Sequence, residues 1–209
     1  MSGEASLVSN SIKEINNDSW LIRNHILLSR RSSTHNIQMV HDAGGVSAVW
    51  NIGEAFCKVK ILDQFVTREH VTLSYLHERD SLSFAAPHVY HHVEYDGRYY
   101  IFLSRLRGQT LSKVWPTMYE ATKTNYVFRG ERICGVDGQN LSDHFLTRLG
   151  LSNDCSPQNL LKNCRELGLE CSKFYFYHYD LGPGNIIVDT TTQSIGIIDW
   201  ETAGFVPKE

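Results

Sequence analysis

Three polar side chains and one histidine in the sequence have the types and the spacing needed for metal-assisted chemistry. His178, Asp180 and Asn185 follow the pattern HxDxxxxN, and residues 182–184, Gly-Pro-Gly, favour a tight turn between them. Carboxylate and amide oxygens are the hard ligands that hold Mg²⁺ together with substrate phosphates. We therefore predict that Asn185 and Asp199 bind a metal ion, which leaves Asp180 available as a base.

The residues around this group predict the element that positions it. Two short apolar runs, 186–188 and 195–198, are separated by the turn-like residues 189–192, which is the pattern of a β-hairpin. Such a hairpin would return Asp199 to the side of Asn185. The competing interpretation is a buried strand pair with a polar loop, and it accounts for the HxD residues more easily than for the whole set.

The complete pattern, HxDxxxxN followed by IIDWE, resembles the catalytic and metal-binding loops of the protein-kinase-like superfamily. It is similar to the aminoglycoside phosphotransferase and choline kinase branch, and DLGPGNIIVD with IIDWETAG looks most like fungal phosphotransferases. The resemblance covers residues 174–203. It implies that Asp180 accepts the proton of a substrate hydroxyl, that Asn185 and Asp199 hold Mg²⁺, and that His178 supports the catalytic loop by hydrogen bonding.

The resemblance also implies an α+β fold of the protein-kinase-like kind, with a small antiparallel-sheet N-lobe and a mainly helical C-lobe. We expect a mobile N-terminal arm over residues 1–17, a nucleotide-binding N-lobe over 18–104 and a C-lobe over 105–209. The C-lobe is expected to be incomplete. Residues 117–138 leave little room for the long helix of relatives, and ten residues follow Asp199.

Local patterns predict several elements of these lobes. Residues 44–62 read as a hairpin that turns at Gly53-Glu54, and residues 87–105 read as a hairpin that turns at Asp96-Gly97. A small strand is expected over 37–40. Helices are expected over 67–78, with Thr67 as the N-cap, and over 141–151 and 157–169.

Two lysines and one glutamate are candidates for binding the nucleotide phosphates. Lys58 and Lys60 alternate onto one face of the second strand of the 44–62 hairpin. The resemblance favours Lys58 as the phosphate lysine, with Lys60 as the alternative and a solvated charge as the plain interpretation. Glu69 resembles the helix glutamate that pairs with this lysine, although an acidic residue in a first turn also stabilises the helix dipole.

The segment that joins the two lobes is the candidate for binding adenine. Ser104, Arg105 and Leu106 match the positions whose backbone groups meet the adenine edge in the family. An ordinary strand end is the alternative interpretation.

Composition argues against several other classes of protein. The net charge is −3 and the basic residues are scattered, which disfavours a nucleic-acid partner. No apolar run is long enough to span a membrane and no signal peptide is evident. The five cysteines are an odd number without CxxC pairs, which indicates reduced thiols. We predict a cytoplasmic protein without a nucleic-acid or membrane partner, and make no prediction of its oligomeric state.

The leading hypothesis is an ATP-dependent phosphotransferase that uses Mg²⁺ to transfer the γ-phosphoryl group to a hydroxyl of a small molecule. The alternative is a catalytically impaired nucleotide-binding or interaction module, and the shortened C-lobe leads us to expect weak or absent transfer. A metal-dependent hydrolase ranks last, because the sequence lacks the His-rich metal cage that is common in such enzymes.

Overall fold

The computed structural model describes residues 12–16, 19–22, 26–29, 37–63, 65–79, 82–114, 129–130, 134–141 and 154–208. The chain divides into two compact units, of which the first comprises residues 1–63 and 87–105 and the second comprises 64–86 and 106–209. The segment 64–86 thus joins the second unit, whereas the predicted N-lobe includes it. The cause is its hydrogen bonding to later residues, since Thr67 N donates to Asn140 O (3.2 Å) and Ala85 N donates to Ile195 O (2.8 Å).

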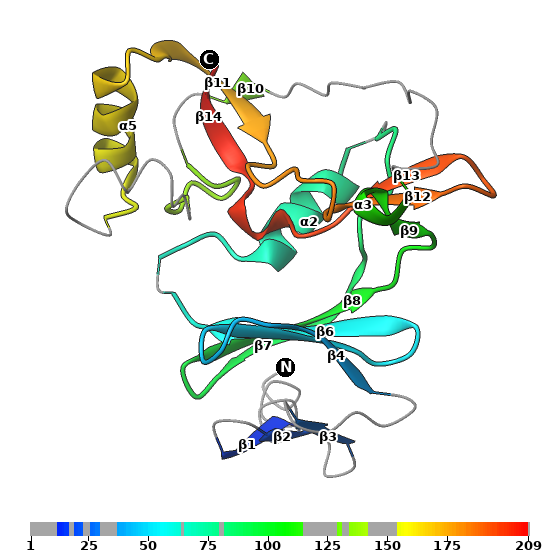
Figure 1. The fold of residues 1–209 in the computed structure, drawn as a ribbon. Coiled ribbons are helices and arrows are strands. Elements are labelled where there is room, and N and C mark those ends of the chain that lie inside the picture. The colour runs from blue at the N-terminus through cyan, green and yellow to red at the C-terminus, as the bar shows by residue number, and fades with distance from the viewer. Residues whose placement is uncertain are drawn as a thin grey trace. The chain divides into compact units, whose positions relative to one another are not determined.

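A five-stranded antiparallel sheet forms the centre of the first unit (Figure 1). Its strand order is β4-β5-β6-β8-β7. Both predicted hairpins are confirmed, β5–β6 and β7–β8, and so is the short strand that precedes them. The strands are β4 (Gln38–Asp42), β5 (Ser47–Asn51), β6 (Ala55–Ile61), β7 (Val89–Tyr95) and β8 (Arg98–Ser104).

One face of this sheet carries a hydrophobic core. Trp50, Cys57, Val59 and Tyr100 are almost completely buried there. Burial raises the pKa of the Cys57 thiol, because the thiolate would lose its hydration. This cysteine is therefore held as an unreactive thiol.

A second, three-stranded antiparallel sheet in the first unit has the order β1-β2-β3. Its strands are β1 (Ile12–Asn16), β2 (Ser19–Ile22) and β3 (Ile26–Ser29). The structure therefore places β1 inside the segment predicted as an arm. The polar sequence of that segment hides the strand because backbone pairing with β2, which the residue pattern does not reveal, satisfies its N–H and C=O groups.

The second unit combines helices with two small sheets, of order β10-β11-β14 and β13-β12-β9 (Figure 1). The predicted helix over 157–169 is confirmed as α5, whose N-cap Ser156 accepts a hydrogen bond from Asn159 N. The helices of the described residues are α2 (Glu69–His77), α3 (Leu111–Val114), α5 (Pro157–Glu166) and the short 3₁₀ helix η2 (Trp200–Thr202). The strands are β9 (Gln109–Thr110), β10 (Arg129–Gly130), β11 (Glu170–Tyr177), β12 (Ile186–Asp189), β13 (Ser194–Ile197) and β14 (Gly204–Lys208).

The hairpin predicted before Asp199 is confirmed as β12–β13. Its register pairs Ile186 with Ile197 and Asp189 with Ser194. In the turn, Asp189 accepts hydrogen bonds from Thr191 N (2.9 Å) and Thr192 N (3.4 Å). These hydrogen bonds, above all that from Thr191 N, lower the pKa of the Asp189 carboxyl.

Helix α2 begins one residue later than its capping pattern predicts. Arg68 is the N-cap and Thr67, the predicted cap, has a different partner. The Thr67 hydroxyl donates to Asp137 Oδ1 (2.6 Å), and Asp137 also accepts from Gln139 N (3.0 Å). A tertiary hydrogen bond to a distant loop therefore replaces the local cap.

The predicted α+β class, with a small antiparallel sheet in one unit, is confirmed. Among the described residues of the second unit, about as many lie in strands as in helices. The longest of these strands, β11, follows α5 and pairs with β14. The helix predicted over 141–151 lies outside the described residues from 142 on, as does most of the segment 117–138. No helix in the described part of the chain is long and apolar enough to cross a membrane.

Gly108 allows the chain to pass very close to the β12–β13 hairpin. Its φ is +118°, and a Cβ atom at this position would overlap the backbone of Val188 and Asp189. We expect Gly108→Ala to lower the free energy of unfolding by at least about 2 kcal/mol, because strain and overpacking add. Thermal denaturation measures this loss. Gly45→Ala, where an added Cβ meets nothing within 4 Å, is the control, and equal stability of the two variants would contradict this reading.

Candidate active site

The loop between β11 and β12 brings Asp180 and Asn185 into direct contact. Asn185 Nδ2 donates to the Asp180 backbone oxygen (2.8 Å) and to Asp180 Oδ2 (3.0 Å). Two backbone hydrogen bonds tighten the turn, from Gly182 N to Asp180 O (2.8 Å) and from Asn185 N to Gly182 O (2.9 Å). Because Nδ2 makes these contacts, Oδ1 is the atom that Asn185 can offer to a cation.

His178 is buried at the start of this loop and is hydrogen-bonded at both ring nitrogens. Asp180 N donates to Nδ1 (3.3 Å), so Nε2 carries the proton and donates to Ile198 O (2.9 Å). Thr202 Oγ1 also donates to His178 O (3.0 Å). These bonds join the loop of residues 178–185 to the chain on both sides of Asp199. A supporting role for His178 in catalysis stays a prediction.

The hairpin carries Asn185 and Asp199 to the same end of β12 and β13. Ile198 N donates to Asn185 O (3.0 Å), one step beyond the last pair of the ladder. Asp199 then adopts a left-handed conformation, with φ 68° and ψ 55°, as the N-cap of η2. The sequence thus correctly predicts that the hairpin returns the chain at Asp199 to the end where Asn185 lies.

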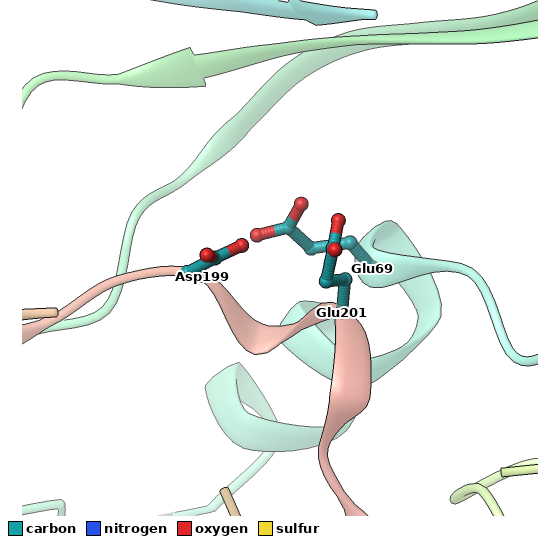
Figure 2. Close-up of side chains that lie close together, drawn as sticks. All are labelled: Glu69, Asp199 and Glu201. Atoms are coloured by element: carbon teal, nitrogen blue, oxygen red, sulfur yellow. The ribbon is translucent and has the colours of Figure 1, made fainter. Parts of the chain in front are cut away.

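Three carboxylates gather where Asp199 leaves the hairpin. Glu69 from α2, Asp199 and Glu201 from η2 each place an oxygen within 4.8 Å of the others (Figure 2). Glu201 was given no role in the sequence-based prediction. Its position two residues after Asp199 is the sequence feature that could have identified Glu201, because both residues belong to one tight helical turn.

Trp200 is held among aromatic rings directly after Asp199. Its ring stacks with Phe84 (5.6 Å between centroids) and with Phe176 (6.1 Å), and it meets His178 edge-on at 4.5 Å. Its indole Nε1 donates to Ile197 O (2.9 Å) and its backbone N donates to Glu69 Oε1 (3.1 Å). This packing explains the tryptophan at the position that directly follows Asp199.

Within the first unit, Lys58 and Lys60 lie on the sheet face opposite the Trp50 core, as predicted. Lys58 pairs with Ile101 and Lys60 pairs with Tyr99 on the neighbouring strand, and both lysines are half-buried. Burial therefore does not distinguish the two lysines, and the choice between them stays a prediction.

The predicted adenine-binding positions differ in what their backbone can offer. Ser104 N donates to His88 O (2.8 Å) and Arg105 N donates to Glu54 O (3.1 Å), so both N–H groups already have partners inside the first unit. Leu106 belongs to the second unit and packs against the backbone of Gly196. The adenine-binding role of this segment stays a prediction.

The oxygen donors of the second unit suit a hard cation. Asn185 offers an amide oxygen and Asp199 a carboxylate, and Mg²⁺ is bound in proteins by one or two carboxylates with the remaining positions taken by water and phosphate. The tight spacing of the Glu69, Asp199 and Glu201 oxygens also places several negative charges together, which favours a cation. The residues present therefore fit the ion that the resemblance implies.

A scan against protein families gives one match, to the phosphotransferase enzyme family, over residues 150–207. The matched segment contains His178, Asp180, Asn185 and Asp199. Residues 150–207 carry the sequence pattern of that family. The predicted resemblance is thereby confirmed for this segment, while its fungal placement stays a prediction. No curated protein matches the chain.

Solved structures of phosphotransferases share low overall similarity with the chain. Aminoglycoside phosphotransferase APH(3'')-Id from Streptomyces rimosus is 18% identical, with a TM-score of 0.48 over 81% of this chain and 72% of that one. A thermostable mutant of APH(4)-Ia, in complex with AMP-PNP and hygromycin B, is 16% identical, with a TM-score of 0.47 over 84% and 69%. The bifunctional kinase-methyltransferase WbdD is 18% identical, with a TM-score of 0.42 over 91% and 38%. The chain spans 34% to 41% of the WbdD structures it matches.

Proposed function

We propose that this chain is an ATP-dependent phosphotransferase that transfers the γ-phosphoryl group to a hydroxyl of a small molecule. The observation that carries the proposal is the contact between Asn185 and Asp180 at one end of the hairpin whose other strand delivers Asp199. A base and two metal ligands in this order are the parts that phosphoryl transfer requires. The family match over the same residues supports the assignment.

Each residue of the second unit has a defined part in this proposal. Asp180 accepts the proton of the attacking hydroxyl, and the Asn185 amide holds the Asp180 carboxylate in place. Asn185 Oδ1 and the Asp199 carboxylate are the proposed Mg²⁺ ligands. When bound, Mg²⁺ neutralises charge on the phosphate oxygens.

The remaining roles rest on the resemblance. Lys58, or Lys60 in its place, would contact the phosphates, and the backbone near Ser104, Arg105 and Leu106 would meet the adenine. The resemblance likewise implies that the acceptor is a small hydroxyl-bearing molecule.

Thermal denaturation with Mg-ATP tests the proposal. A ligand that binds only the folded chain stabilises it by about 2.7 kcal/mol at 100 times its Kd. For a chain of this size, that gain raises the Tm by about 5–10 °C.

ATP with EDTA, and Mg²⁺ without nucleotide, are the controls and should give smaller shifts. A cooperatively melting sample whose Tm is the same with Mg-ATP as with either control would refute the proposed function.

A further inference from the structure

Buried side chains hold the peptide groups on both sides of Asp199. On the N-terminal side, Ile198 O accepts from His178 Nε2 (2.9 Å) and Ile198 N donates to Asn185 O (3.0 Å). On the C-terminal side, Trp200 N donates to Glu69 Oε1 (3.1 Å). Asp199 therefore lies between two peptide groups that are held by hydrogen bonds, and one of the residues that hold them, Glu69, comes from helix α2.

Asp199 needs such support because of its backbone conformation. Its φ of 68° and ψ of 55° are left-handed, a region in which non-glycine residues are uncommon, although Asp and Asn occupy it more often than the others. Conformations of this kind persist where the surrounding structure fixes them. Loss of one fixing hydrogen bond would let the backbone relax and turn the Asp199 carboxylate away from its present direction.

Glu69 is well placed to supply that support. Its side chain is 2% exposed and comes from the first turn of α2, which is anchored by the buried residues Leu73 and Leu76. The partner of Oε1 is a neutral backbone N–H group, so this contact needs an oxygen acceptor at the correct distance and does not need a negative charge.

We infer that Glu69 is a positioning residue for Asp199, which acts by accepting the Trp200 N–H and thereby aims the Asp199 carboxylate. This role differs from the pairing with a strand lysine that the resemblance implies, because it depends on the oxygen and not on the charge. It rests on the proposed function only in treating Asp199 as a metal ligand.

Three variants of the full chain separate the oxygen from the charge. Glu69→Gln keeps an oxygen at the same position without the charge, Glu69→Asp keeps the charge and withdraws the oxygen by one methylene, and Glu69→Met removes both. Amide hydrogen exchange of Trp200 in metal-free, ¹⁵N-tryptophan-labelled protein reports the hydrogen bond directly. Only four tryptophans are present, and Trp200→Phe assigns the signal.

We expect Trp200 exchange about 10-fold faster in Glu69→Asp and Glu69→Met, and within about 3-fold of wild type in Glu69→Gln, as for loss of one hydrogen bond. Mn²⁺ binding in the presence of ATP should follow the same order, with affinity about 10-fold weaker in Glu69→Asp and Glu69→Met than in the wild type. Glu201→Gln, which removes the same charge from the same cluster, should keep wild-type Trp200 exchange. Near-UV circular dichroism checks folding, and the Gln–Asp comparison suffices if Glu69→Met does not fold.

The results distinguish this inference from the proposed function. Fast exchange in Glu69→Gln, or wild-type exchange in Glu69→Asp and Glu69→Met, would overturn the positioning role. So would the expected exchange pattern with unchanged Mn²⁺ affinity. If the variants show the expected exchange pattern but the wild-type chain binds no Mn²⁺ with ATP, the proposed function would be overturned, while the hydrogen-bonding role of Glu69 would stand.

Discussion

Asp180→Asn should lower the rate of phosphoryl transfer by about 10²- to 10⁴-fold, the usual contribution of a general base. Asparagine keeps an oxygen that can accept the hydrogen bond from Asn185 Nδ2, so the loop geometry should survive. The variant loses only the ability to take a proton from the acceptor hydroxyl. ATP affinity, measured by calorimetry, should stay within about 3-fold of wild type, because the base acts in turnover and not in binding.

A matched control is available on the adjoining hairpin. Asp189→Asn removes the same charge at the turn of β12–β13, and its amide oxygen can still accept from Thr191 N. This variant should retain wild-type turnover. A loss of activity in Asp180→Asn that is no larger than in Asp189→Asn, or that is matched by an equal loss of ATP affinity, would contradict the role of Asp180 as a base.

Asp199→Asn should weaken Mg²⁺-dependent ATP binding by about 100-fold or more. Even residues that only orient metal ligands change metal affinity by about 10- to 100-fold, and Asp199 is proposed as a direct ligand. Asparagine is one of the few residues that tolerate the left-handed conformation seen here, so the backbone of η2 should be retained. The variant therefore isolates the loss of the charged ligand from a change in fold.

Calorimetric titration of ATP with and without Mg²⁺ measures this effect. The loss should be confined to the titration with Mg²⁺, and it should exceed the loss in Asp180→Asn. If the two variants bind Mg-ATP equally well, Asp199 is not the principal metal ligand, and the division of roles between the two aspartates is wrong.

The elements that sequence analysis predicts best are those whose cause is local. The turn at Asp96-Gly97 requires two consecutive residues with positive φ, and the structure gives them 49° and 70°. The Thr-rich turn of β12–β13 also has a local cause, because the Asp189 side chain accepts a hydrogen bond from Thr191 N. Such turns determine the register of the hairpins. The register of β12–β13 then determines that Asn185, before β12, and Asp199, after β13, lie at the same end of the hairpin.

The features that sequence analysis misses depend on partners distant in the chain. Thr67 has the residue type of an N-cap, but its hydroxyl donates to Asp137 instead. The hydrogen bond from Trp200 N to Glu69 joins residues 131 positions apart, so no local sequence pattern predicts it. The helix pattern of residues 67–78 shows that Glu69 lies in a first turn, and only the folded chain shows which group it faces.

That separation of 131 residues also has a consequence for biosynthesis. At ordinary translation rates, Trp200 leaves the ribosome on the order of 10 s after Glu69. Helix α2 can form during this interval. The Glu69 carboxylate, which is buried in the folded chain, then has no Trp200 N–H to accept from and must stay hydrated. The site around Asp199 therefore assembles after most of the chain has been synthesised, and during that interval the apolar face of α2 is a candidate binding surface for chaperones.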